Sequence, residues 1–390
     1  MGRRGNGEGS ITKRKDGLYM ARYTVETATG TKRETIYAKT RREAAERLSE
    51  ALADRDKGMV FNAGSTTVGE YVTRWLEDSA KGNLAPRSYH NYRLQLRQHI
   101  IPSIGRVKLS KLSPANVQAL YAAKLNDGLK PSSVRSIHAV LHCALEQAVK
   151  WNLIPRNPAR AVDPPKIRED EITPLDPEQV RKFLYAASGE KFEALYVLSL
   201  TTGLRMGEAL GLKWTDIDLD AETLRVNRQL QRMRKDGNKA GKLEFSEPKN
   251  ASRRAVDLPA RTVRALCAHR KRQLEEKLGA GALYKDQGLV FATGKGTPVE
   301  AQNVVNRHFK PLLRCAGLPN IRWHDLRHTC ATLLLSRGTH PTYVQKLLGH
   351  ASVQLTLDRY SHWMPTMGKH TANAMDEALE VYDTREEEVV

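Results

Sequence analysis

The sequence contains few cysteines and no long apolar run. Its four cysteines are scattered without a Cys-x-x-Cys pair, which argues against a disulfide framework or a thiolate zinc site and suits a reducing cytoplasm. The start, MGRRGNGEGS, lacks the apolar segment of a signal peptide, and Asn6 stands where a myristoylation signal requires Ser or Thr. No apolar run approaches the length of a membrane span. We therefore expect a cytoplasmic protein with no membrane partner. The cysteines are Cys143, Cys267, Cys315 and Cys330.

Positive charge dominates the composition. The chain has 63 Lys and Arg against 44 Asp and Glu, a formal net charge of +19, and the basic residues recur along its whole length. Such a charge favours a polyanionic partner, most commonly nucleic acid. A basic but unspecific surface is the alternative, because net charge reports on solubility and non-specific association. The 390 residues are enough for two or three domains.

Residues 1–60 predict a small three-stranded sheet followed by a helix. Strand-like alternation is broken by turn signals at Asp16-Gly17 and Thr29-Gly30. Thr40 and Glu43 have the spacing of a capping box for the helix that follows. We expect either a nucleic-acid-binding module or a plain solvated sheet face, and this segment alone favours neither. The basic side chains that would contact DNA are Lys13, Arg14 and Arg22.

Residues 66–160 predict a bundle of four helices. Helix starts are marked by Thr67 with Glu70, Ala85-Pro86, Ser113-Pro114 and Pro131. The proline-rich run from Ile154 to Pro165 then breaks helical structure, and we interpret it as an interdomain hinge. One face of the bundle carries basic side chains that suit a phosphate backbone. The candidates for DNA contact are Arg87, Arg93 and Arg97.

Residues 172–390 predict a mainly helical domain with a small antiparallel sheet. An apolar helix ends at Gly203, and residues 221–233, 242–247 and 253–259 have strand patterns, with residues 248–252 as the turn between the last two. From Met375 the chain has an amphipathic helical pattern and then an acidic tail. The whole chain is therefore expected to be a multidomain α+β protein.

The stretch from Trp323 to Tyr360 gathers polar residues that do not fit the apolar positions of its helices. His324, Arg327, His350 and Tyr360 are these residues. Upstream, Arg205 follows a helix-ending glycine, and Glu208 can hold its guanidinium through an i, i+3 ion pair. A planar guanidinium binds two phosphate oxygens at once, so two arginines suit the crowded charge of a phosphodiester transition state.

A tyrosine nucleophile needs help with its proton, because deprotonating a group of pKa about 10 at pH 7 costs roughly 4 kcal/mol. The neighbouring cations offset part of this cost, and the histidines can orient phosphate oxygens or accept the proton. The leaving alkoxide needs an acid, for which Lys249 is the candidate, with Lys239 and Lys242 as competitors. Cationic side chains can supply the charge stabilisation, so no metal or other cofactor is required.

The motifs TTGLRMGEAL, PKNASRR, HDLRHTCATLLL and LLGHASVQLTLDRY, in this order, resemble the tyrosine recombinases, and the layout is similar to a phage or integrative-element integrase. The resemblance implies an arm-site DNA-binding domain over residues 1–60, a core-site-binding domain over 66–160 and a catalytic domain over 172–390. By motif, Arg205 and Arg327 are the two catalytic arginines, His324 belongs to the H-x-x-R, His350 is the second histidine, and Tyr360 is the nucleophile.

The resemblance also implies a reaction and its partners. Tyr360 is expected to attack the scissile phosphate of double-stranded DNA, forming a 3′-phosphotyrosine and releasing a 5′-hydroxyl, without ATP or another high-energy cofactor. The enzyme is expected to act as a homotetramer on core and arm attachment sites, on the nucleoid of a bacterial host. An excision factor and a host DNA-bending protein are left open as further partners.

Three alternatives compete with this interpretation. One is a zinc site with His324 and His328 spaced i, i+4 on a helix and Cys330 and Asp325 nearby; it is disfavoured because Arg327 would lie beside the cation. A DNA-binding regulator with the same fold and a type IB topoisomerase are the others. In the recombinase interpretation, His328 is structural or supports a catalytic side chain.

Overall fold

The chain divides into two compact units, residues 1–169 and 170–390. In the computed structural model, no helix among the described residues is long and apolar enough to cross a membrane. The structure describes residues 9–27, 30–56, 65–167, 173–233, 241–248 and 253–364.

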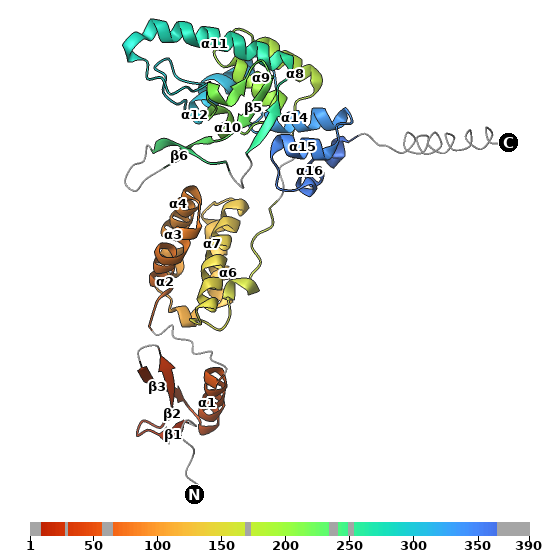
Figure 1. The fold of residues 1–390 in the computed structure, drawn as a ribbon. Helices are drawn as coiled ribbons and strands as arrows, with labels where there is room; N and C mark the ends of the chain where they lie inside the picture. The colour runs from red at the N-terminus through yellow and green to blue at the C-terminus, as the bar shows by residue number, and fades with distance from the viewer. Residues whose placement is uncertain are drawn as a thin grey trace, which may run out of the picture. The chain divides into compact units, whose positions relative to one another are not determined.

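The first unit begins with an antiparallel sheet in the order β1-β2-β3, as predicted. Helix α1 packs on one face of this sheet, and Ala21, Ala38, Ala44 and Leu48 form the buried contact (Figure 1). The predicted turn at Thr29-Gly30 falls partly outside the described residues. The elements are β1 (Ser10–Lys13), β2 (Tyr19–Thr27), β3 (Gly30–Ala38) and α1 (Arg41–Asp56).

The cap of α1 differs in detail from the prediction. The Glu43 amide donates to Thr40 Oγ1 at 3.2 Å, as a capping box requires. The Glu43 carboxylate, however, accepts from the amide of Lys39 at 3.2 Å and not from that of Thr40. Only half of the predicted reciprocal pair is therefore formed.

The rest of the first unit is the predicted helical bundle. The Thr67–Glu70 capping box is present in full, and Ser113 caps its helix through Asn116 with Pro114 at the first helical position. The helices are α2 (Val68–Trp75), α3 (Lys81–Asn83), α4 (Pro86–Gln95), α5 (Ile101–Ile104), α6 (Pro114–Asn126) and α7 (Pro131–Lys150), with π-helical turns at Leu76–Ala80 and Leu96–Ile100 and 3-10 turns at Leu109–Lys111 and Pro158–Ala161.

The second unit is mainly helical and carries two small antiparallel sheets, which confirms the predicted fold class. Its helices are α8 (Pro177–Ala186), α9 (Glu193–Thr202), α10 (Met206–Leu210), α11 (Ala260–Ala280), α12 (Ala301–Val304), α13 (Lys310–Cys315), α14 (Asp325–Ser336), α15 (Pro341–Leu348) and α16 (Val353–Tyr360). Its strands are β4 (Ile217–Asp218), β5 (Thr223–Val226), β6 (Gln229–Met233), β7 (Lys242–Ser246) and β8 (Arg254–Asp257). The described residues of this unit also form a π-helical turn at Val305–Phe309 and 3-10 turns at Trp214–Asp216, Gly281–Leu283 and Ser361–Trp363.

The strand pairing corrects one prediction. Strands β7 and β8 were expected to flank a hairpin turn, but β7 pairs with β6 and β8 pairs with β5. The predicted long strand over residues 221–233 is broken at Asn227 and Arg228, whose side chains donate to the buried carboxylate of Asp216. Strands β7 and β8 therefore belong to different sheets and do not form one hairpin.

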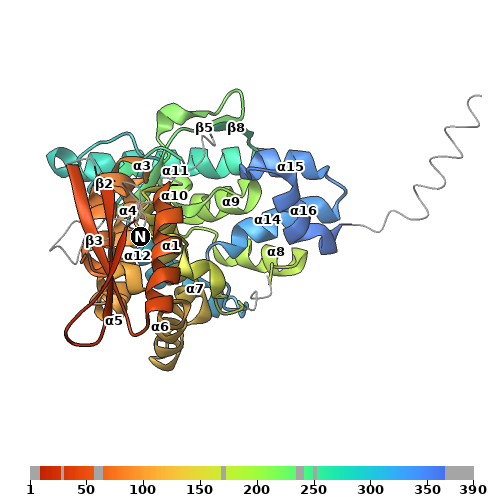
Figure 2. The ribbon, with the colours of Figure 1, turned by 90° about the horizontal axis from the view of Figure 1, so that it is seen from below.

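Helix α9 lies at the centre of the second unit. Every residue from Ala194 to Leu200 is buried, and α9 packs against both α11 and α14. Seen from below, helices α14, α15 and α16 lie together at one side of α9 (Figure 2). The long-range packing of α14 on α9 brings residues near 203 and 327 together, which is how the site is assembled.

Candidate active site

Arg327 is a buried arginine that joins two helix ends. Its side chain leaves α14, and the residue is 3% exposed. Nη1 donates to the carbonyl of Gly203 at 2.7 Å, and Nη2 donates to that of Leu348 at 2.6 Å. These oxygens belong to the last turns of α9 and α15, where helical carbonyls lack an intrahelical partner. Burial, followed by the charge of Arg205, lowers the pKa of Arg327 to about 9, so it stays cationic at neutral pH.

Arg205 stands at the N-terminus of α10 and pairs with Glu208, as the i, i+3 spacing predicts. Its Nη1 lies 2.8 Å from Glu208 Oε1, and its amide donates to Oε2 at 3.1 Å. Nη2 reaches the carbonyl of Gly349 at 3.4 Å. The Arg205 side chain is 37% exposed, whereas that of Glu208 is buried. Arg205 is thus anchored on one side and open to a ligand on the other.

Glu208 also binds Arg254, a residue that the sequence interpretation did not single out. Arg254 Nη2 lies 2.9 Å from Glu208 Oε2, and its Nε donates to the carbonyl of Leu347 at 2.8 Å. Burial opposes ionisation of Glu208, but the guanidinium groups of Arg254 and Arg205 hold its pKa below the usual value. A signal was present: Arg254 shares the inward side of β8 with buried Val256.

His350 follows the C-terminus of α15 and is held by its own segment. Gly349 ends the helix in the left-handed region, with φ of 65°, which glycine adopts without strain. The His350 ring contacts Thr356 Oγ1 through Nδ1 at 2.9 Å, and its carbonyl accepts from Gln345 Nε2 at 2.6 Å. The ring is thereby oriented from α16 while its backbone is fixed by α15.

Tyr360 ends α16, and its side chain is buried, with the residue 1% exposed. Its hydroxyl oxygen lies 2.6 Å from His328 Nδ1, and its ring lies parallel to that of His350 at 6.4 Å between centroids. Burial raises the pKa of Tyr360 to about 12, against the opposing charges of Arg327 and Arg359. The phenol is therefore protonated at neutral pH.

The three histidines of the site are neutral at physiological pH. Burial lowers the pKa of His328 to about 4, with His324 contributing next. Desolvation, then the charges of Arg327 and Arg205, lowers the pKa of His324 to about 4 and that of His350 to about 3. Neutral imidazoles can accept or donate a hydrogen bond, which suits groups that contact a phosphate or a phenol.

Three lysines are candidates for the proton donor. Lys249 and its competitor Lys239 lie outside the described residues. Lys242 is described, begins β7 and is exposed. The assignment of the proton donor therefore stays a prediction.

The candidate DNA-contacting residues lie on the small sheet and on the helical bundle of the first unit. Lys13, Arg14 and Arg22 of the small sheet are exposed. In the bundle, Arg87 and Arg97 are exposed, whereas Arg93 is partly buried and lies over the Tyr89 ring at 5.8 Å. These positions suit contact with a phosphate backbone but remain predictions.

The alternative zinc site finds no support in the geometry. Within the described ranges, no group of three or more His, Cys, Asp or Glu is placed to hold a metal ion. The Cys330 thiol is buried, and burial raises its pKa to about 12, which disfavours the thiolate that zinc requires. His328 instead faces Tyr360.

A mainly helical unit with this set of side chains has the layout of a tyrosine recombinase. The chain belongs to the phage integrase family: residues 174–366 match that family, and residues 67–125 match its N-terminal SAM-like domain. It is a site-specific recombinase of the integrase type, an enzyme that integrates or excises mobile DNA elements. The resemblance inferred from the motifs is thus confirmed.

Several relatives and solved structures are similar along most of the chain. A tyrosine recombinase XerC-like protein of Caldanaerobacter subterraneus is 31% identical, covering 88% of this chain and 90% of the relative. The ICEBs1 integrase of Bacillus subtilis is 25% identical, covering 88% and 91%. In fold, the chain is similar to the Tn1549 transposon integrase in complex with a circular intermediate DNA (TM-score 0.66, 23% identity, 81% of this chain and 100% of that one). A lambda integrase tetramer bound to a Holliday junction is also similar (TM-score 0.57, 19% identity, 93% and 97%).

Proposed function

We propose that Tyr360 is the nucleophile of this recombinase and that Arg205 and Arg327 bind the scissile phosphate. The observation that carries the proposal is the position of the Tyr360 hydroxyl, 2.6 Å from a neutral imidazole and under the field of Arg327. Two guanidinium groups stabilise the extra charge of a pentacoordinate phosphorus. His324 and His350 donate hydrogen bonds to phosphate oxygens.

The proton of Tyr360 needs an acceptor during attack. With a pKa of about 12, full deprotonation at pH 7 would cost about 7 kcal/mol, so transfer accompanies attack. We assign the acceptor to His328 Nδ1, because it lies within hydrogen-bond distance of the hydroxyl. The Tyr360 oxygen forms a bond to phosphorus, the bond to the 5′ oxygen breaks, and Lys249 protonates that oxygen. The product is a 3′-phosphotyrosine and a 5′-hydroxyl.

In this proposal, the first unit binds the DNA. Residues 1–60 bind arm sites through Lys13, Arg14 and Arg22, and residues 66–160 bind the core site through Arg87, Arg93 and Arg97. Residues 172–390 then carry the chemistry. The lambda integrase relative forms a tetramer on a Holliday junction, and we propose the same assembly on two duplexes here. Linked modules raise the effective concentration on DNA that bears both kinds of site.

A suicide-substrate assay tests the proposal. Core-site DNA nicked next to the scissile phosphate, incubated with the protein in EDTA, should give a covalent protein–DNA adduct. Tyr360→Phe should abolish the adduct, and Tyr343→Phe should retain it, because Tyr343 is half exposed on the neighbouring helix α15. An adduct that persists in Tyr360→Phe, or that requires a divalent metal, would overturn the assignment of the nucleophile.

A further inference from the structure

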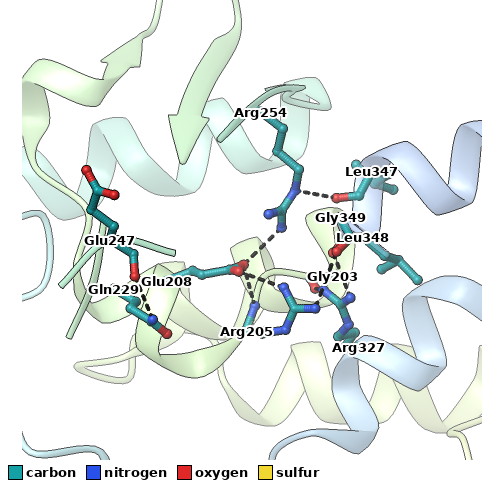
Figure 3. Close-up of polar contacts among 10 residues, drawn as sticks. All are labelled: Gly203, Arg205, Glu208, Gln229, Glu247, Arg254, Arg327, Leu347, Leu348 and Gly349. Carbon is teal, nitrogen blue, oxygen red and sulfur yellow. Dashed lines mark hydrogen bonds and ion pairs between the residues drawn. The ribbon is translucent and has the colours of Figure 1, made fainter. Parts of the chain in front are cut away.

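Three arginines from separate segments meet at the C-terminus of α15. Arg254 donates to the carbonyl of Leu347 at 2.8 Å, Arg327 to that of Leu348 at 2.6 Å, and Arg205 to that of Gly349 at 3.4 Å (Figure 3). The last carbonyls of a helix lack intrahelical donors and carry the negative end of its dipole. Consecutive backbone oxygens of one helix end therefore collect three cationic side chains.

Arg254 is the more buried of the two arginines that bind Glu208. Its side chain is 9% exposed and that of Glu208 is 2% exposed, whereas Arg205 keeps access to solvent. A buried charge is tolerated only when it is paired and hydrogen-bonded. Glu208 accepts from Arg254 and Arg205 at once, so the position of either guanidinium constrains the other.

Gly349 gives a second and independent indication. A Cβ atom at this position would lie 2.9 Å from Arg254 Nη1 and 3.2 Å from its Cζ, which is closer than side-chain atoms pack. The guanidinium of Arg254 thus occupies the space that any other residue at position 349 would fill. Gly349 therefore has two roles: it ends α15 in the left-handed conformation, and it leaves space for the Arg254 guanidinium.

We propose that Arg254 is a positioning residue of the phosphate clamp, by which we mean the two arginines, Arg205 and Arg327, that bind the scissile phosphate. Arg254 holds the Glu208 carboxylate in place, and Glu208 in turn holds Arg205 against the carbonyls at the end of α15, which also accept hydrogen bonds from Arg327. Arg254 itself makes no contact with DNA. The inference rests on the proposed role of Arg205 and Arg327. Strand β8 is thereby tied to the phosphate clamp through a residue to which the sequence motifs assigned no role.

The test compares Arg254→Lys and Arg254→Gln with Arg253→Gln. Lysine keeps the charge but has no fork that reaches Glu208 and the Leu347 carbonyl together. Arg253 is the matched control, because this neighbour is 63% exposed and pairs with Glu247 at the surface. Each variant is assayed for core-site binding and for single-turnover adduct formation on the nicked substrate.

Two substrates separate positioning from general damage. One has an ordinary scissile phosphodiester, and the other has a methylphosphonate, in which a methyl group replaces one charged oxygen and less charge needs stabilising. Both Arg254 variants should bind the core site normally and lose about 100-fold in adduct rate on the phosphodiester. The loss on methylphosphonate should be less than 10-fold, and Arg253→Gln should match the wild type on both.

The result that would overturn the inference is an equal loss on both substrates, or no loss in either Arg254 variant. Failure of the underlying function is distinguishable, because the wild-type protein would then form no adduct, or one that survives Tyr360→Phe. A wild-type adduct that is lost in Tyr360→Phe but retained in both Arg254 variants would refute only the role of Arg254.

Discussion

Replacing His328 with phenylalanine tests how Tyr360 loses its proton. The substitution keeps an aromatic ring in a buried position but removes Nδ1, which lies 2.6 Å from the Tyr360 hydroxyl. Burial keeps the pKa of His328 near 4, so the imidazole is neutral throughout the physiological range and can accept the hydrogen bond of the phenol, taking up its proton only as the bond to phosphorus forms. The variant has no acceptor at this place.

The magnitude follows from the pKa of Tyr360, which is about 12. At pH 7.5 the phenolate is roughly 6 kcal/mol above the phenol, and a positioned base typically contributes 10²- to 10⁴-fold. Single-turnover adduct formation by His328→Phe should fall by about that factor. Its rate should also rise roughly tenfold per pH unit from pH 6 to 9, because the variant must rely on phenolate present at equilibrium.

Two controls accompany this measurement. His308→Phe changes a histidine that packs against Phe192, and it should react like the wild type. His328→Asn keeps a hydrogen-bonding side chain without a basic nitrogen, and it should be as slow as His328→Phe. Wild-type rates in His328→Asn would reduce His328 to a positioning role, and wild-type rates in His328→Phe would refute the reasoning.

Two further predictions concern stability and the α15 helix end. Gly349→Ala should reduce adduct formation more than tenfold, because the added methyl group would contact Arg254. The control is Gly338→Ala, where φ is 79° and the surrounding space is open; this substitution should cost only about 1–2 kcal/mol of stability from left-handed strain. Equal adduct rates in the two variants would contradict the role of the contact. The folded-state pKa of His328 is depressed to about 4, so the unfolded chain binds more protons below pH 6.5, and stability falls as pH drops toward 4. At pH 5 the loss from this residue is about 2 kcal/mol. Amide-exchange protection of α14 should therefore fall by about that much more in the wild type than in His328→Phe, where His324 and His350 still contribute.

Local signals made much of the fold predictable. The helix starts at Thr67 and Ser113 are formed as predicted, because a helix cap involves residues only a few positions apart. The Arg205–Glu208 ion pair was predictable for the same reason. Each of these interactions depends on a short stretch of chain whose geometry the helix itself supplies.

Contacts that depend on distant packing were not predictable. The bond between His328 and Tyr360 forms only because α16 folds back onto α14. The role of Arg254 depends on α15 packing against β8, and neither helix period nor strand alternation encodes that contact. The incorrect pairing of β7 with β8 has the same origin, since strand patterns identify strands but not their partners. Lys249 stays a prediction.

In the proposed mechanism, the row of carbonyls at the end of α15 makes the main chain part of the support for the two arginines that bind the phosphate. Leu347, Leu348 and Gly349 present their oxygens whatever apolar side chains stand at the first two positions. Conventional mutagenesis of the leucines would therefore report only on packing. An amide-to-ester exchange at the peptide bond after Leu347, which weakens the carbonyl as an acceptor and leaves every side chain intact, is the substitution that would expose what the helix end contributes.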